Sequence, residues 1–183
     1  MSDVVALVRV TDRHKPVLAN LLQFYLHDFS EFCELELSPH GTYTYNYLDH
    51  YFVEVGHEPL FVTAGGQIAG FALMRHHADD RMNQVAEFFV LRAHRRRGVG
   101  RAAAHALLRR YPGAWRLEFF DRNAPARRFW PQVVAEVATG PVEVRQLRPR
   151  QVDQTCTQLL FRVGPPVPLE AVGTQSESRS GRV

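Results

Sequence analysis

A short segment rich in arginine and glycine, residues 95–101, carries the clearest chemical signal in the sequence. It follows an apolar run, Phe88 to Leu91, and precedes an alanine-rich run, so the pattern predicts a strand, a tight turn and a helix. A helix start has unpaired backbone N–H groups and the positive end of the dipole, and glycines let an anion approach that backbone. The consecutive arginines Arg95, Arg96 and Arg97 indicate that the anion is phosphate.

The glycine spacing differs from the two best-known phosphate loops. The segment contains neither Gly-x-x-x-x-Gly-Lys nor Gly-x-Gly-x-x-Gly beginning at Gly98. Instead, Arg95-x-x-Gly98-x-Gly100 after an apolar strand resembles the pyrophosphate loop of the GNAT superfamily, the acetyl-CoA-dependent N-acetyltransferases. A second segment, from Asn123 to Trp130, is similar to the later motif of that family, Asn-x-x-Ala-x-x-Phe-Tyr, in order and in spacing.

This resemblance implies acetyl-CoA as the cofactor and assigns its contacts. The backbone N–H groups of the loop would bind the pyrophosphate, and the preceding strand would pair with the pantetheine arm. One strand N–H would also polarise the thioester oxygen. The second motif would add one side-chain contact and one packing contact. The expected cofactor-binding residues are Phe89, Val90, Leu91, Arg95, Arg96, Arg97, Gly98, Val99, Gly100, Arg101, Asn123 and Phe129.

Acetyl transfer to an amine requires that the amine be neutral when it attacks. An alkyl ammonium has a reference pKa of about 10.4, so a deprotonation step or a water relay is needed at neutral pH. Glu87 is the candidate catalytic base, because several GNAT enzymes place a carboxylate just ahead of the cofactor-pairing residues and burial would raise its pKa. The alternative is a solvated or salt-bridged strand glutamate.

The position that follows Phe129 departs from the family pattern. The family often has a tyrosine there, which protonates the leaving thiolate, but this chain has Trp130. An indole N–H is a donor that does not ionise usefully. Three alternatives remain open: the thiolate leaves unaided, a tyrosine elsewhere serves, or catalysis is feeble or absent.

The acceptor pocket in this family is built largely from the first helices and the central hairpin. Aromatic rings and carboxylates there would enclose an ammonium group by cation–π and ionic contacts. The alternation of three tyrosines between 43 and 47 favours a strand with its rings on one face, and the alternative for each candidate is a core or surface role. The expected acceptor residues are Tyr25, Asp28, Tyr43, Tyr45 and Tyr47, with Glu31 and Tyr51 nearby.

Charge is unevenly distributed along the chain. Residues 92–128 contain eleven arginines and two acidic residues, whereas residues 1–91 contain five basic and twelve acidic residues. A basic region would gather a polyanionic cofactor, and an acidic surface elsewhere would favour a cationic co-substrate. The net charge of +3 conceals this polarity.

Hydrophobic periodicity and turn residues predict the elements that position these groups. Strands are expected at 4–10, 60–64, 68–74, 88–91, 115–120, 142–147 and 155–163, and helices at 14–32, about 102–111 and 124–135, the last despite Pro131. The segment 43–53 is either a short helix or irregular. This order is that of the GNAT fold, an α/β (α+β) class with a mixed central sheet of six to seven strands and about four helices.

Length and composition predict one GNAT N-acetyltransferase domain over residues 1–163 and a disordered tail over 164–183. Two cysteines are too few for a disulfide framework, and no apolar run reaches membrane-spanning length, so we expect a cytoplasmic enzyme with no membrane partner. No metal site is expected, since His76 and His77 point to opposite faces of a strand. Members of the family often form homodimers.

Three functions from different classes fit the sequence. The first is an N-acetyltransferase that acts on a primary amine of a small molecule, peptide or protein. The second is a non-catalytic acyl-CoA-binding module, which Trp130 suggests. The third is nucleic-acid binding through the arginines, which leaves the glycine spacing and the Asn123 motif unexplained.

Overall fold

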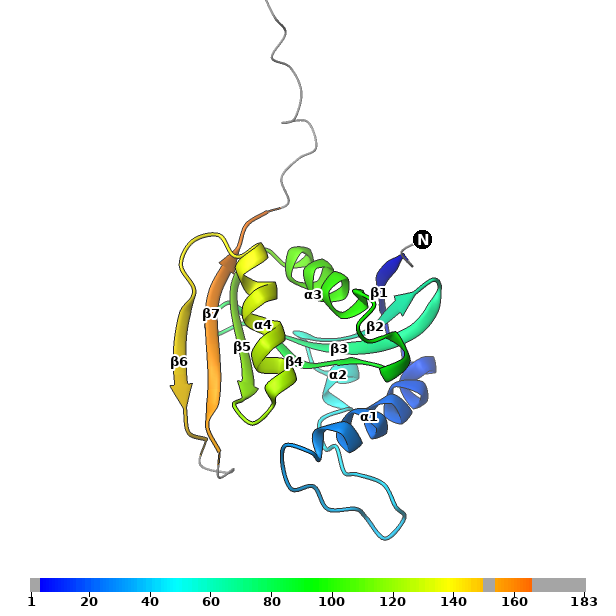
Figure 1. Ribbon diagram of the computed structural model, residues 1–183. Coiled ribbons are helices and arrows are strands. Elements are labelled where there is room, and N and C mark those ends of the chain that lie inside the picture. The colour runs from blue at the N-terminus through cyan, green and yellow to red at the C-terminus, as the bar shows by residue number, and fades with distance from the viewer. Residues whose placement is uncertain (1–3, 150–153, 166–183) are drawn as a thin grey trace, which may run out of the picture.

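The computed structural model describes residues 4–149 and 154–165 and contains one seven-stranded mixed sheet with helices on both faces (Figure 1). In chain order the strands are β1 Val5–Arg9, β2 His57–Ala64, β3 Gln67–His77, β4 Met82–Val90, β5 Gly113–Phe120, β6 Glu143–Leu147 and β7 Cys156–Val163. The helices are α1 Lys15–Phe29, α2 His50–Val53, α3 Val99–Arg110 and α4 Ala124–Val137, and two short 3-10 turns cover Asp12–His14 and Arg92–His94. The tail predicted from Gly164 lies outside the described residues from position 166 onward.

The sheet has the strand order β1-β2-β3-β4-β5-β7-β6. All neighbours pair antiparallel except β4 and β5, which are parallel and are therefore joined by a crossover through α3. The hairpin predicted at Gly65 and Gly66 is confirmed, with both glycines at positive φ as a type I′ turn requires. The predicted fold class and element order are likewise confirmed.

The segment of three tyrosines differs from its strand-like prediction. Only His50–Val53 is helical, and Tyr43 makes just an isolated bridge to Leu37. The backbone N–H of Tyr43 donates to Gln23 Oε1 at 2.8 Å and its carbonyl accepts from Gln23 Nε2 at 3.0 Å, so a side chain takes the place of a partner strand. The Tyr45 and Tyr47 rings lie 5.9 Å apart, whereas the Tyr43 ring lies 6.4 Å from that of His27.

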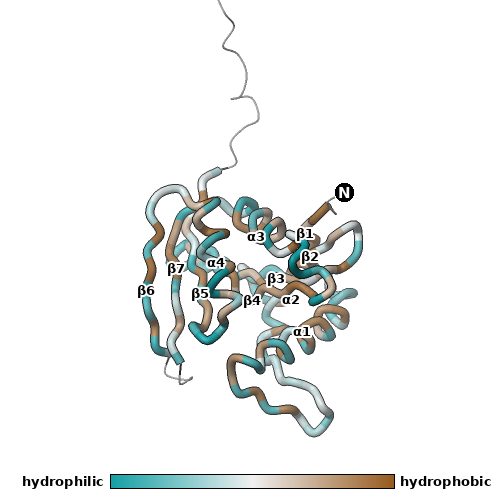
Figure 2. The backbone as a smooth tube through the Cα atoms, viewed as in Figure 1, coloured by the Kyte–Doolittle hydropathy of each residue, from teal (hydrophilic) through white to brown (hydrophobic). Residues whose placement is uncertain are grey.

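Two apolar layers hold the helices to the sheet. On one face, Leu107 of α3 and Val133 of α4 pack with Trp115 and Leu117 of β5. On the other face, helix α1 and the segment around α2 pack against β2, β3 and β4, and this cluster includes Leu18, Leu22, Tyr51, Phe61, Phe71 and Phe89. Figure 2 shows hydrophobic residues along the central strands and recurring within the helices. The two layers cover opposite faces of the sheet, and β4 and β5 separate in the part of the sheet that lies between them.

The separation of β4 from β5 is the feature that positions the site. These strands pair only over Met82–Val85 with Ala114–Leu117. Beyond that point β4 runs on to Val90 with β3 alone as its neighbour, and β5 runs on with β7 alone. A register shift opposite Leu73 and Met74 places a bulge in β4 at the same level. The two strands thus form a V that is open toward the start of α3.

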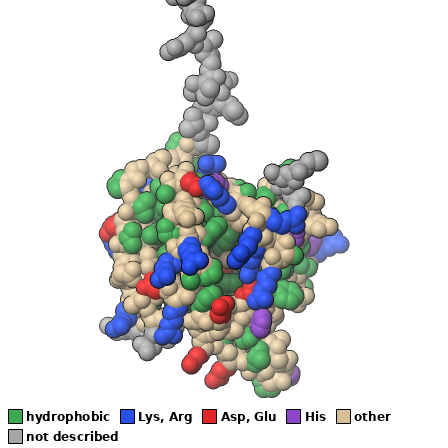
Figure 3. Space-filling model, viewed as in Figure 1, with side chains coloured by type: hydrophobic (Ala, Val, Ile, Leu, Met, Phe, Trp, Pro, Cys, Tyr) green, Lys and Arg blue, Asp and Glu red, His purple; other side chains and the backbone are tan. Residues whose placement is uncertain are grey.

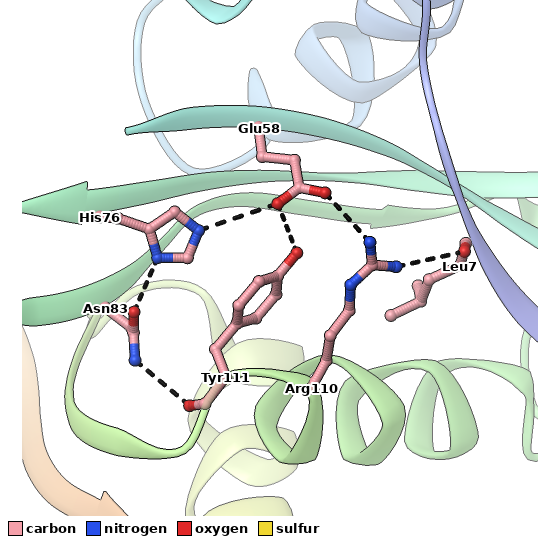
Figure 4. Close-up of polar contacts among 6 residues, drawn as sticks. All are labelled: Leu7, Glu58, His76, Asn83, Arg110 and Tyr111. Atoms are coloured by element: carbon pink, nitrogen blue, oxygen red, sulfur yellow. Dashed lines mark hydrogen bonds and ion pairs between the residues drawn. The ribbon is translucent and has the colours of Figure 1, made fainter. Parts of the chain in front are cut away.

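A polar cluster fixes the far end of α3 (Figure 4). Glu58 of β2 accepts hydrogen bonds from Tyr111 Oη at 2.5 Å and from Arg110 Nη2 at 3.2 Å, and His76 Nε2 lies 3.9 Å from the same carboxylate. Asn83 Oδ1 lies 2.7 Å from His76 Nδ1, and Asn83 Nδ2 donates to the Tyr111 carbonyl at 3.2 Å. With its last turn bonded to three strands, α3 presents its first turn to the open V in a fixed orientation.

Candidate active site

The loop between β4 and α3 has the backbone conformation of an anion site. Gly98 has φ +81° and Arg96 has φ +58°, the left-handed region that favours glycine at the first of these positions. Helix α3 begins at Val99, and the N–H groups of Val99, Gly100 and Arg101 have no acceptor among the described residues. A Cβ on Gly98 would meet nothing within 4 Å, so conformation and not packing explains the glycine. The predicted loop is therefore present and accessible.

The arginines of the loop fall into two groups. Arg96 and Arg97 are exposed within it. Arg95, by contrast, folds back onto the protein: its Nε donates to the Val90 carbonyl at 2.7 Å, and its guanidinium lies over the Phe89 ring. Arg101 pairs with Glu136 of α4. The backbone and the exposed Arg96 are thus the groups in the loop best placed to meet an anion.

Asp28, predicted as an acceptor residue, lies with these arginines. Its carboxylate accepts from Arg95 Nη2 at 2.5 Å and from Arg92 Nη2 at 2.6 Å. Partial burial alone would raise the pKa of Asp28, but the two guanidinium groups lower it below its usual value. Asp28 therefore ties α1 to the start of the loop, and it is not among the residues that line the cavity described below.

The backbone of β4 alternates between its two neighbours. The Leu91 N–H donates to the Ala69 carbonyl at 2.8 Å, and the register pairs Val90 with Gly70. In an antiparallel ladder alternate residues bond to the partner strand, so the main-chain groups of Leu91 and Phe89 face β3. Those of Phe88 and Val90 face the open V. Of the residues expected to pair with the cofactor, Val90 thus presents its main chain to the V, whereas Phe89 and Leu91 present theirs to β3.

A cavity of about 550 Å³ fills the V. Its walls come from both strands, from α1, from α4 and from the loop after α1. The lining residues are Tyr25, Leu26, Phe29, Leu35, Thr44, Tyr45, Val85, Ala86, Glu87, Phe88, Leu117, Glu118, Phe119, Phe120, Asn123, Ala126, Trp130, Pro149 and Cys156. In Figure 3, which faces α3 and α4, basic side chains surround a central area of hydrophobic ones. The cavity is lined from both faces of the sheet, and Phe129, which stacks on the lining residue Phe88, lies between it and Gly100 of the anion-site loop.

Glu87 lies in the wall of this cavity, on the side that faces α1. Tyr25 Oη donates to Glu87 Oε2 at 2.5 Å, and Tyr45 Oη donates to Glu87 Oε1 at 3.2 Å. Burial raises the pKa of Glu87, and the two hydrogen bonds oppose that rise only in part. The same burial, together with the charge of Glu87, raises the pKa of both tyrosines. The arrangement holds one carboxylate with a raised pKa between two hydroxyls that stay protonated at neutral pH.

Arg75 lies close behind this carboxylate. Its Nε donates to Tyr51 Oη at 3.1 Å, and its guanidinium lies 5.9 Å from the ring centroids of Tyr47 and Tyr51. The positive charge of Arg75 moderates the pKa of Glu87 without an ion pair between them. Among the described residues Glu87 is thus held by two tyrosine hydroxyls and pairs with no cation.

Trp130 lines the cavity on the α4 side, and Phe129 packs behind it. The Trp130 ring lies 5.2 Å from that of Phe88 and 4.9 Å from that of Phe129, and its indole N–H has no acceptor among the described residues. Phe129 stacks on Phe88 at 6.0 Å. A Cβ on Gly100 would lie 3.8 Å from Phe129, so the Phe129 ring packs against the first turn of α3. The role of Phe129 as a packing contact to the cofactor stays a prediction.

Asn123 has a local role that the sequence motif did not reveal. Its Oδ1 accepts the N–H of Ala126 at 3.0 Å, which caps the N-terminus of α4. Asn123 also lines the cavity, so its Nδ2 is the group left for a ligand. The predicted cofactor contact and the cap are compatible.

The predicted acceptor residues are divided by the structure. Tyr25 and Tyr45 line the cavity, whereas Tyr43 and Tyr47 do not. The Tyr43 ring lies 6.4 Å from that of His27, and Tyr47 is 56% exposed. The sequence analysis missed several lining residues on the α1 side, namely Leu35, Thr44, Glu118, Phe120 and Pro149. The alternation of buried residues along β5 predicts which face of the sheet Glu118 lies on. The sequence does not predict where β4 and β5 stop pairing, so it does not predict that Glu118 lines a cavity.

Two further features bear on what the chain binds. Within residues 4–149 and 154–165, no three His, Cys, Asp or Glu side chains are grouped so as to hold a metal ion. Across the same residues, no helix combines the length and the hydropathy that a bilayer span demands.

The sequence and the fold both have counterparts among known proteins. Residues 19–133 match the model of the Acetyltransferase (GNAT) family. No curated protein matches the sequence. An acetyltransferase from Thermus thermophilus is similar in structure, with a TM-score of 0.65 at 14% identity over 89% of this chain and 100% of that one.

Two other solved structures hold a ligand. Aminoglycoside acetyltransferase AAC(6')-Ib, in complex with coenzyme A, gives a TM-score of 0.62 at 12% identity over 87% of this chain and 95% of that one. A structure from Bacillus anthracis str. Ames, in complex with acetyl coenzyme A, gives a TM-score of 0.52 at 15% identity over 88% of this chain and 99% of that one. At these identities the likeness is one of fold.

Proposed function

Because the chain belongs to the GNAT acetyltransferase family, we propose that it moves an acetyl group from acetyl-CoA to a primary amine of a small molecule, peptide or protein. The observation that carries this proposal is the cavity in the V between β4 and β5, with the anion-site loop at one side and Glu87 at the other. Residues up to Val163 would form one catalytic domain.

The described residues fit acetyl-CoA as the donor. The N–H groups of Val99, Gly100 and Arg101 offer unpaired donors for a diphosphate at the start of α3. The main-chain groups of Phe88 and the N–H of Val90, whose carbonyl accepts from Arg95, offer an edge for an extended amide-bearing arm. Acetyl-CoA supplies a thioester, whose carbonyl carbon is the electrophile.

Glu87 would remove a proton from the acceptor amine. Its carboxylate faces the cavity on the α1 side. Because the pKa of Glu87 is raised, it is closer to the pKa of the acceptor ammonium group from which Glu87 must take the proton. Tyr25 and Tyr45 hold both oxygens in place, one each. Where the amine does not touch the carboxylate directly, a water molecule in the cavity would relay the proton.

The two tyrosines do not take the place of the acid that Trp130 lacks. Both hydroxyls donate to Glu87, and their raised pKa values make them weaker acids than an ordinary tyrosine. The thiolate would therefore leave unaided. Support for a catalytic protein over the non-catalytic acyl-CoA-binding module comes from Glu87, a carboxylate with a raised pKa in the wall of the cavity.

Nucleic-acid binding has less support than the sequence suggested. Part of the basic window is paired with carboxylates from other elements, since Arg92 and Arg95 share Asp28 and Arg101 pairs with Glu136. Arg110 pairs in the same way with Glu58. A continuous basic face, which phosphate-backbone binding requires, is not formed by these side chains.

The test is the release of free coenzyme A thiol when the protein is mixed with acetyl-CoA and a panel of primary amines. We expect amine-dependent thiol release, with an acetylated amine detectable by mass spectrometry. Acetyl-CoA alone should raise the melting temperature. A raised melting temperature without turnover of any amine would favour the non-catalytic module, and no shift at all would contradict the proposal.

A further inference from the structure

We infer that the acceptor carries a second cationic group and that Glu118 binds it. This inference rests on the proposed function, because it concerns the acceptor side of the same cavity. Glu118 is a residue of β5 that the sequence motifs do not involve, and it lines the cavity.

The two carboxylates of the cavity lie on the same face of the sheet, across the V from each other. Along β5 the side chains of Leu117 and Phe119 are buried under α4, so those of Glu118 and Phe120 point to the opposite face. The Phe120 ring indeed contacts Phe29 of α1 at 5.6 Å. Glu87 is bonded to Tyr25 of the same helix. Both carboxylates therefore border the space beneath α1.

Glu118 is distinguished from other carboxylates near the site by its partner. Asp28, Glu58 and Glu136 each pair with an arginine. Glu118 Oε1 instead accepts a hydrogen bond from the neutral amide Gln158 Nε2 at 2.6 Å, and among the described residues no cation pairs with it. The hydrogen bond from Gln158 orients the Glu118 carboxylate but does not neutralise its negative charge.

The remainder of the lining suits an extended cation. The two glutamates are the charged residues among the lining residues, so no basic side chain opposes a dication there. Between them stand aromatic rings, Tyr25, Tyr45 and Phe120, which pack well against a methylene chain and attract an ammonium group by their quadrupoles. An amine that reacts beside Glu87 would place a second ammonium group, a few methylenes away, toward Glu118.

The experiment compares matched pairs of amines, α,ω-diamines and n-alkylamines of three to six carbons, by kcat/KM for thiol release. We expect the wild type to prefer one of the diamines over its matched monoamine by about tenfold, as a partly shielded charge pair provides. Glu118→Gln should reduce that preference roughly fivefold to tenfold, mainly through KM. Glu118→Asp, which keeps the charge on a shorter side chain, should restore part of it.

Glu143→Gln is the matched control. Glu143 lies on the same face of the sheet, in β6, but is exposed, pairs with Arg145 and does not line the cavity. It should leave the preference at the wild-type value. Equal kcat/KM for diamines and monoamines, or a preference that survives Glu118→Gln, would overturn this inference while the proposed function stands. Turnover of no amine at all would overturn both.

Discussion

Replacing Glu87 with glutamine tests the role of the cavity carboxylate. The amide has nearly the same shape, and its oxygen still accepts a hydrogen bond from Tyr25, so the local packing should persist. What is lost is the negative charge and the ability to accept a proton. Because Glu87 lies on the α1 side of the V, the loop that would bind the diphosphate is untouched.

The expected loss in kcat is about 100-fold, the lower end of what a general base contributes, because water in the cavity can relay protons in part. In the wild type, kcat should fall as the pH is lowered, because Glu87 becomes protonated. The midpoint of this acid limb should lie above the ordinary glutamate pKa, since burial raises the pKa of Glu87. In Glu87→Gln that limb should vanish. Because the pKa of Glu87 is raised in the folded protein, the free energy of unfolding of the wild type falls as the carboxylate ionises. Above that pKa the variant should therefore be no less stable than the wild type.

The assay is steady-state thiol release at saturating acetyl-CoA across the pH range, on the best amine of the panel. Binding of acetyl-CoA, measured by calorimetry, should be within about twofold of the wild type. Glu143→Gln controls for the removal of one carboxylate from the same sheet. A Glu87→Gln variant with full activity and an unchanged acid limb would refute the assignment of Glu87 as the base.

Three further predictions concern the groups around this site. Gly98→Asp should remove detectable acetyl-CoA binding by calorimetry, whereas Gly98→Ala, whose Cβ meets nothing, should cost only the strain of positive φ, about 1 kcal/mol of stability. Tyr45→Phe should move the acid limb of the pH profile to higher pH, because it removes a hydrogen bond that lowers the pKa of Glu87; an unmoved limb would argue against that bond. Asp28→Asn should lower the free energy of unfolding by about 1 kcal/mol at pH 7, and the deficit should disappear as pH falls through the lowered pKa of Asp28.

Much of the fold was predictable because its signals are local. The glycine pair 65–66 requires a hairpin, and the apolar periodicity of α1 and α4 requires helices with one buried side. The segment 43–49 was not predictable in the same way, because its conformation depends on the Gln23 side chain, twenty residues away from Tyr43. Periodicity cannot report such a contact.

The candidate site was predictable where the backbone acts and less so where side chains from distant elements meet. The loop around Gly98 follows from residue types and spacing alone. The pairing of Asp28 with Arg95 and the bonding of Tyr45 to Glu87 join residues more than forty positions apart, so the sequence gives no distance between them. The face of β4 that is free for a ligand likewise depended on the register with β3.

A crystal structure of the protein with coenzyme A would test the central claim most directly. The account predicts the diphosphate on the N–H groups of Val99, Gly100 and Arg101, and the pantetheine arm in the V, bonded to the main chain of Phe88 and Val90. Coenzyme A bound outside the V, or a V filled by protein when the ligand is present in excess, would contradict it.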